Sequence, residues 1–107
     1  MRAYELMIIF SADLDESTVQ TSINKIAGQA EAAGASVEKI DKWGLRRFAY
    51  EIQHKWEGFY VVLEFASPNA LDEIDRTLRL ADDVIRHKFI RLPLAEAHRR
   101  GLTAVTA

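Results

Sequence analysis

Cysteine is absent from this chain of 107 residues, and so is any long run of apolar residues. The lack of cysteine excludes a disulfide framework and a thiolate zinc site, and it fits a reducing cytoplasm. A helix that crosses a bilayer needs about 20 mostly apolar residues, which no segment supplies. The first residues also lack the charged region, apolar stretch and cleavage site of a signal peptide. We therefore expect a cytoplasmic protein without membrane contact.

Signatures of catalysis and cofactor binding are missing too. The sequence contains no Gly-x-Ser-x-Gly motif, no P-loop and no dinucleotide-binding fingerprint. His54 and His98 have no histidine or carboxylate at ligand spacing. His87, between Arg86 and Lys88, is expected to stay neutral or to pair with phosphate. The sequence therefore predicts no catalytic residue, no metal, no cofactor and no small-molecule substrate.

A large excess of charge is also lacking, because the formal net charge is -2. That value alone argues against nucleic acid, but the distribution of charge is uneven. Acidic residues gather within 13–16 and 72–83, as the helix dipole favours at helix starts. Basic residues gather at Arg46, Arg47, Arg86, Lys88, Arg91, Arg99 and Arg100. The molecule could have one basic side, or the bases could lie where no helix begins, and both interpretations can hold at once.

What is present is enough apolar sequence for a core, since 49% of the residues are hydrophobic and the length suits one compact domain. Alternating patterns predict strands at 4–10, 37–52, 59–65 and 84–92. Gly44 predicts a bulge or bend inside the second strand. The polar segment 54–58 is expected to connect the second and third strands as a hairpin.

Two helices are predicted between these strands. The first has Asp13 or Asp15 as its N-cap and ends at Gly34. The second is expected to start at the Ser-Pro-Asn segment 67–69, because proline is tolerated in a first helical turn. Apolar residues at helical spacing follow in both segments.

The order of these elements is β-α-β-β-α-β, which predicts an α+β protein of the ferredoxin-like, split β-α-β class. We expect a four-stranded antiparallel sheet with both helices on one face. Residues 1–93 form this domain and 94–107 form a C-terminal tail, expected to be mobile unless a partner holds it.

The other face of the sheet is left uncovered by the predicted helices. A register slip of one residue would exchange the two faces. The residues expected on the uncovered face are Glu5, Met7, Ile9, Tyr60, Val62 and Glu64. Several are apolar, which suggests burial by something outside the domain.

The segment 44–50, Gly-Leu-Arg-Arg-Phe-Ala-Tyr, places two arginines inside a predicted strand. Guanidinium groups match phosphate oxygens in shape and stay charged at any relevant pH, so Arg46 and Arg47 indicate a surface that meets phosphate. The competing interpretation is that they are solvated residues that protect a sheet edge from aggregation.

Five segments together resemble bacterial small-subunit ribosomal protein six: 2–5, Gly34, 44–50, 58–60 and 86–91. The resemblance runs from residue 1 to about residue 92, and 44–50 is its most specific part. It implies a ferredoxin-like fold and a structural role on the ribosome. It also implies binding to the central domain of small-subunit ribosomal RNA, with small-subunit ribosomal protein eighteen as heterodimer partner.

By position, the resemblance assigns an RNA- and partner-facing set of Arg2, Arg46, Arg47, Arg86, His87 and Arg91. Tyr4 and Tyr50 match the same motifs, although such tyrosines are more often core-edge residues than platforms for bases. Lys88 joins the set because a lysine there neutralises phosphate. The chain departs from the family at Ala3, which is often basic, and in a tail that carries His98-Arg99-Arg100 in place of an acidic extension.

Two other functions remain open from the residues alone. Ferredoxin-like domains also form homodimers around small-molecule pockets, as enzymes or as sensors. An enzyme needs an acid–base residue in an apolar pocket, and His87 among bases suits that poorly. A sensor that pairs edge to edge predicts a stable homodimer, which the charged edge strand disfavours.

Overall fold

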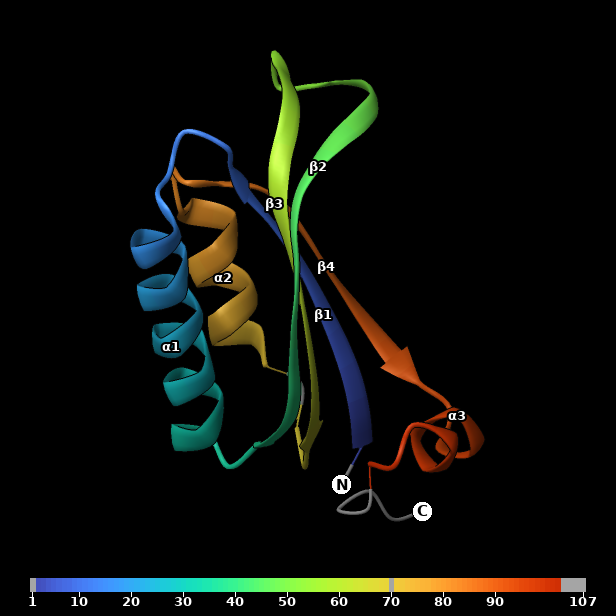
Figure 1. Cartoon of the computed structure of the whole chain (residues 1–107). Helices are drawn as coiled ribbons and strands as arrows, with labels where there is room; N and C mark the ends of the chain where they lie inside the picture. Colours follow the sequence, from blue (N-terminus) through green and yellow to red (C-terminus); the bar gives the residue numbers. More distant parts are fainter. Residues whose placement is uncertain (1, 70, 103–107) are drawn as a thin grey trace.

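The computed structural model describes residues 2–69 and 71–102, which form a layer of two helices packed on a sheet, with a third, short helix at one end of the sheet (Figure 1). Its elements are β1 (Arg2–Ser11), α1 (Glu16–Ala32), β2 (Ser36–Ile52), β3 (Lys55–Ser67), α2 (Asp72–Leu80), β4 (Val84–Leu92) and α3 (Leu94–Arg99). The strands form one antiparallel sheet in the order β2-β3-β1-β4. Helices α1 and α2 cover one face, and α3 lies across the sheet from them. The predicted ferredoxin-like fold is therefore confirmed.

The main core lies between the sheet and the helices α1 and α2. Alternate residues of β1 and β3 point into it, as the period of two requires. Ile23 of α1 and Ile74 of α2 meet them from the helix side. The most buried strand residues of this core are Leu6, Ile8, Phe10, Val61, Leu63 and Phe65.

The ends of α1 agree with the sequence-based prediction. Asp15 is the N-cap, and its Oδ1 accepts a hydrogen bond of 2.7 Å from the backbone N–H of Thr18. Gly34 follows the helix with φ +93°, a left-handed conformation that suits glycine.

The start of α2 was predicted wrongly. Ser67 ends β3 and is fully buried, and its hydroxyl donates to the carbonyl of Asn69. Residues 67–69 therefore make a turn rather than a helix start. The helix begins at Asp72, and its N-cap Leu71 offers no side-chain hydrogen bond. Acidic residues in the first turn interact favourably with the helix dipole instead.

The hairpin connection at 54–58 was also predicted wrongly, because β3 already begins at Lys55. The turn consists of Gln53 and His54, whose φ angles are 50° and 62°. Two left-handed residues make the tight turn that matches the twist of a hairpin. The predicted bulge near Gly44 is confirmed, since the pairing of β2 with β3 shifts between Lys42 and Gly44.

The six residues predicted for the uncovered face do share one face. They form three cross-strand pairs: Glu5 with Glu64, Met7 with Val62 and Ile9 with Tyr60. Along each strand these residues alternate with residues of the core. We call this side of the sheet the open face.

Part of the predicted tail is folded. Helix α3 packs beside β1, and Ala97 and Leu102 are buried against one end of the open face. Residues 103–107, which were also assigned to the tail, lie outside the described residues. Within the described ranges, no helix is long and apolar enough to cross a membrane.

Candidate nucleic-acid and partner interface

A bulge in β2 shapes the hairpin end of the open face. Arg47 pairs with Glu57 and Ile52 pairs with Lys55, so β2 uses more residues than β3 to cover the same stretch. The surplus residues bend β2 over the open face, where the hairpin extends beyond the rest of the sheet (Figure 1). Gln53 ties the hairpin to the opposite edge of the sheet, because its Nε2 donates to the carbonyl of Ile85 in β4 at 2.9 Å.

The bend places Phe48 on a small second core. Phe48 packs with Ile9 and Ile85, and all three are at least nine-tenths buried. Tyr60 packs against the same cluster, with its ring 6.1 Å from that of Phe48. The open face is thus partly covered by the chain itself, which explains why Ile9 is buried without any partner.

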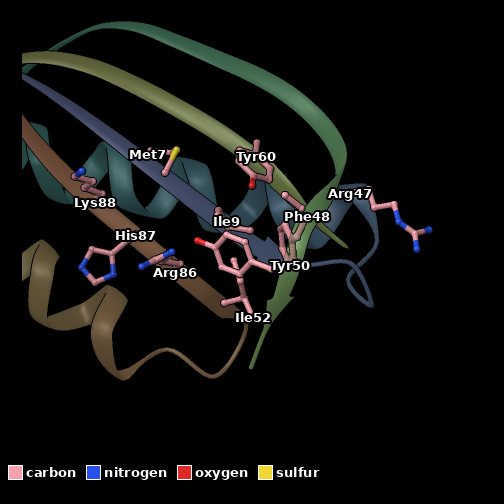
Figure 2. Close-up of a pocket in the computed structure, with 11 residues that line it drawn as sticks. Met7, Ile9, Arg47, Phe48, Tyr50, Ile52, Tyr60, Arg86, His87 and Lys88 are labelled. Carbon is pink, nitrogen blue, oxygen red and sulfur yellow. The ribbon is translucent and has the colours of Figure 1, made fainter. Parts of the chain in front are cut away.

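A groove of about 590 Å³ lies above this cluster, between β2 and β4. Figure 2 shows Tyr50 and Phe48 directed toward Ile9, while Arg47 points outward from the hairpin. Tyr50 is 62% exposed although its ring lies over apolar neighbours. The groove therefore has an apolar floor and an accessible aromatic rim.

Exposed cations border this groove. Arg86 lies opposite Ile9 and Lys88 opposite Met7, so both belong to the open face of β4. Arg46 and Arg47 are exposed on the bulged strand. Within residues 2–69 and 71–102, none of these four side chains forms an ion pair with a carboxylate. Their charge is available to an external anion.

The rest of the predicted set lies on the helix side of the sheet. Arg2 and Tyr4 alternate with the open-face residues of β1, and Arg91 is directly opposite Tyr4. Tyr4 stacks on Phe65, with a ring separation of 5.7 Å. The structure therefore brings together Arg47, Tyr50, Arg86 and Lys88, with Arg46 beside them, but separates these from Arg2, Tyr4 and Arg91. His87 lies at the border of the groove, on the strand between Arg86 and Lys88.

His87 has a partner inside the protein. Its Nε2 donates to Asp75 Oδ1 of α2 at 2.7 Å, and its side chain is only 14% exposed. Its ring also meets Phe89 edge to face at 6.3 Å. This geometry gives His87 a role in joining β4 to α2; an RNA-facing role stays a prediction.

The pattern of residues in the sequence contained signals for two features that were missed. Arg46, Phe48 and Tyr50 are spaced two residues apart, which predicts that all three lie on one face of a strand. Residues 94–100 follow a proline and are good helix formers, ending before Gly101. Arg100 of that segment reaches Glu5 and Glu64, and no sequence pattern pointed to that contact.

The described residues hold no group of three or more His, Asp or Glu side chains arranged for a metal ion. His87, a histidine that lines the groove, has its ring nitrogen Nε2 bonded to Asp75 and not free in the groove. The arrangement suits binding of an extended, negatively charged, partly aromatic ligand better than acid–base chemistry.

Comparisons with known proteins agree with this picture. A family model described as ribosomal protein S6 matches residues 3–91. The small ribosomal subunit protein bS6 of Carboxydothermus hydrogenoformans is 47% identical over 92 residues, which cover 85% of this chain and 96% of that protein. The corresponding protein of Salinispora tropica is 49% identical over the same coverage.

A solved structure of a ribosomal protein S6 is also similar to this chain. The crystal structure of 30S ribosomal protein S6 from Thermotoga maritima has a TM-score of 0.84 and 27% identity, and it covers 95% of this chain and 97% of its own. The P2 domain of the chemotaxis kinase CheA, from the same organism, has a TM-score of 0.55 at 15% identity and shares only the fold. From the family match and the identity to curated relatives, we conclude that this chain belongs to the ribosomal protein S6 family, whose members are structural proteins of the small ribosomal subunit and not enzymes.

Proposed function

We propose that this structural ribosomal protein binds the central domain of small-subunit ribosomal RNA, together with small-subunit ribosomal protein eighteen. The observation that carries the proposal is the open face: an apolar, aromatic groove bordered by cations that no carboxylate of the described chain neutralises. Membership of the S6 family places the protein on the ribosome in the cytoplasm.

The hairpin end of the open face is suited to RNA. Arg47, Arg86 and Lys88 are positioned to neutralise phosphates and release counterions, which supplies most of the affinity for a nucleic-acid backbone. Tyr50 offers an exposed ring on which an unpaired base can stack. This set of residues supports the proposal because it gives a protein of net charge -2 a local surface that attracts an anion.

The middle of the open face is suited to a protein. Trp43 is 47% exposed and stacks on Tyr60, and Ile90 is 37% exposed on β4. Val62 and Met7 lie between them on the central strands. Aromatic and aliphatic anchors of this kind typically form the centre of a protein interface.

The experiment that tests the proposal is a salt titration of binding to small-subunit RNA fragments, with and without small-subunit ribosomal protein eighteen. We expect tight binding that needs the partner and weakens as salt rises. Binding in neither condition would contradict the proposal. A homodimer that persists on dilution, measured by sedimentation, would then favour the homodimeric small-molecule alternative.

A double variant locates the interface. Arg46→Ala with Arg47→Ala is expected to weaken assembly and to lower the salt slope by about one phosphate for each arginine that makes a contact. The control is Lys25→Ala with Arg76→Ala, which removes the same charge from exposed positions on α1 and α2. Equal affinity of the two double variants at moderate salt would show that the arginine pair only protects the sheet edge.

A further inference from the structure

Helix α3 covers the end of the open face that lies far from the groove. Ala97 and Leu102, 0% and 2% exposed, pack against Ala3, Ala66 and Leu92. The three strand residues belong to the open face, because they alternate with core residues in β1, β3 and β4. Figure 1 shows α3 across the sheet from α1 and α2. The chain therefore occupies part of the surface that a protein partner would use.

A single side chain connects α3 to the polar part of this surface. Arg100 Nη1 lies 3.2 Å from Glu5 Oε1 and 3.2 Å from Glu64 Oε1, and its Nε donates to Glu96 Oε1 at 2.7 Å. Glu5 and Glu64 are directly opposite each other on neighbouring strands, and their side chains are 22% and 12% exposed. Like charges in this position repel each other, and the guanidinium of Arg100 offsets that repulsion.

Within the part of the chain that the structure describes, α3 has few other attachments to the sheet. It has six residues, far fewer than a helix needs to be stable alone in water. Its N-cap is Pro93, which makes no side-chain hydrogen bond to the helix. Its apolar contact rests on Ala97, with Leu102 packing beside it just beyond the end of the helix. A helix of this length is expected to form only when it is docked, and Arg100 is its polar attachment to the strands among the described residues.

We propose that α3 is a removable cover of the open face, latched by Arg100, and that a basic protein partner displaces it when it docks. The inference rests on the proposed function, since it requires a protein that binds the open face. A basic partner fits because removal of α3 leaves Glu5 and Glu64 facing each other without a cation. Glu64 Oε2 is buried and has no hydrogen-bond partner among the described residues, so the pair can also accept a further donor. The partner's apparent association constant is then the intrinsic constant multiplied by the fraction of molecules in which the cover is open.

The test begins with the free protein. Arg100→Gln removes the charged contact to Glu5 and Glu64, and faster amide hydrogen exchange is expected over residues 95–102 while the exchange of β1 and β3 stays unchanged. The matched control is Arg99→Gln, since Arg99 is 72% exposed and its polar contacts within residues 2–69 and 71–102 are with Glu96. Unchanged exchange in Arg100→Gln would show that Arg100 is not a latch and would overturn the proposal.

The second measurement is calorimetric titration with small-subunit ribosomal protein eighteen. Arg100→Gln is expected to raise the affinity several-fold, by up to about tenfold for a cover that is closed in nine molecules of ten. Arg99→Gln is expected to match the natural protein. Glu5→Gln with Glu64→Gln is expected to loosen α3 without the gain in affinity, because it also removes the pair that the partner's cation would use.

The outcomes separate the two proposals. If the natural protein binds the partner and Arg100→Gln binds no tighter, the cover is refuted while the proposed function stands. If Arg100→Gln binds more weakly, α3 is part of the interface and the cover is likewise refuted. If neither the natural protein nor Arg100→Gln binds the partner, the proposed binding of small-subunit ribosomal protein eighteen is wrong. The displacement of α3 by that partner is then wrong as well.

Discussion

At Gly58 the strands and the bulge of β2 approach so closely that no side chain fits. A Cβ atom there would lie 2.5 Å from Ile9 Cγ2, 2.9 Å from the carbonyl oxygen of Phe10 and 3.0 Å from Phe48 Cζ. Gly58→Ala is therefore expected to destabilise the protein by about 1–3 kcal/mol, because overpacking forces its neighbours apart. Chemical denaturation monitored by circular dichroism would measure the loss.

The control is another glycine of the same chain. Gly28 lies in the exposed part of α1, and an added Cβ meets nothing within 4 Å. Gly28→Ala is expected to raise the free energy of unfolding by about 0.5–1 kcal/mol, since alanine favours a helix interior. A Gly58→Ala protein as stable as the natural one would contradict the close packing over the groove.

A second prediction concerns the N-cap of α1 and acid. The hydrogen bonds from Thr18 lower the pKa of Asp15 below its usual value. A carboxylate with a lowered pKa contributes its full stability above about pH 4, and the contribution is lost as the pH falls through the lower, folded-state pKa. Asp15→Ala is thus expected to reduce stability at pH 7 and to make a smaller difference near pH 2.

Thermal unfolding of both proteins across pH 2–7 would measure this effect. Asp15→Asn is the control, because asparagine caps a helix without titrating. A stability difference between Asp15→Ala and the natural protein that does not change with pH would mean that the charge of Asp15 contributes nothing to the cap.

At the scale of single elements, the hairpin turn is held in an unfavourable backbone conformation. Gln53 and His54 both have positive φ, although neither is glycine or asparagine. The side chain of His54 is 97% exposed, and it pairs with Glu51 at the surface. His54→Gly is expected to stabilise the protein by up to about 1 kcal/mol, because glycine adopts this conformation without steric cost.

His54→Ala separates the backbone effect from the ion pair. It removes the contact to Glu51 but keeps a Cβ atom in the left-handed conformation, so no gain in stability is expected. Equal stability of the glycine and alanine variants in urea titrations would indicate that the turn carries no strain.

The elements that the sequence predicted well are those with strong periodicity and clear end signals. The strand at 84–92 and the first helix have both, and their predicted and observed positions agree. The start of α2 was misplaced because Ser67-Pro68-Asn69 suits a turn as well as a helix start. The hairpin turn was misplaced because Gln53-His54 is not a typical turn sequence.

The candidate site was predictable only in part, because its geometry depends on contacts between segments that are distant in the sequence. The sequence shows that Arg86, His87 and Lys88 are close in the chain, but the alternation of β4 sends His87 to α2 and the other two to the open face. The bulge that brings Tyr50 over the sheet depends on the pairing between β2 and β3, which is a tertiary property. The contact of Arg100 with Glu5 joins opposite ends of the chain and has no local signal.

At the scale of the whole molecule, the open face is divided by charge. Its hairpin end carries the cations Arg47 and Arg86, Lys88 follows toward the middle, and the end under α3 carries Glu5 and Glu64. The two ends lie on one continuous sheet. An RNA and a basic protein can therefore be attracted to different ends of the same surface, although the net charge is only -2.

This division predicts that the position of a charge matters more than the total charge. Lys88→Glu and Arg76→Glu change the net charge by the same amount, but Lys88 lies on the open face and Arg76 on α2. Lys88→Glu is expected to slow association with the RNA fragment and to flatten the dependence of the rate on salt, because steering acts within about 10 Å at 0.1 M salt. Arg76→Glu is expected to change the rate little.

Stopped-flow fluorescence at several salt concentrations would measure the association rates of both variants. Equal slowing by the two variants would mean that the RNA responds to the net charge and not to the basic end of the open face.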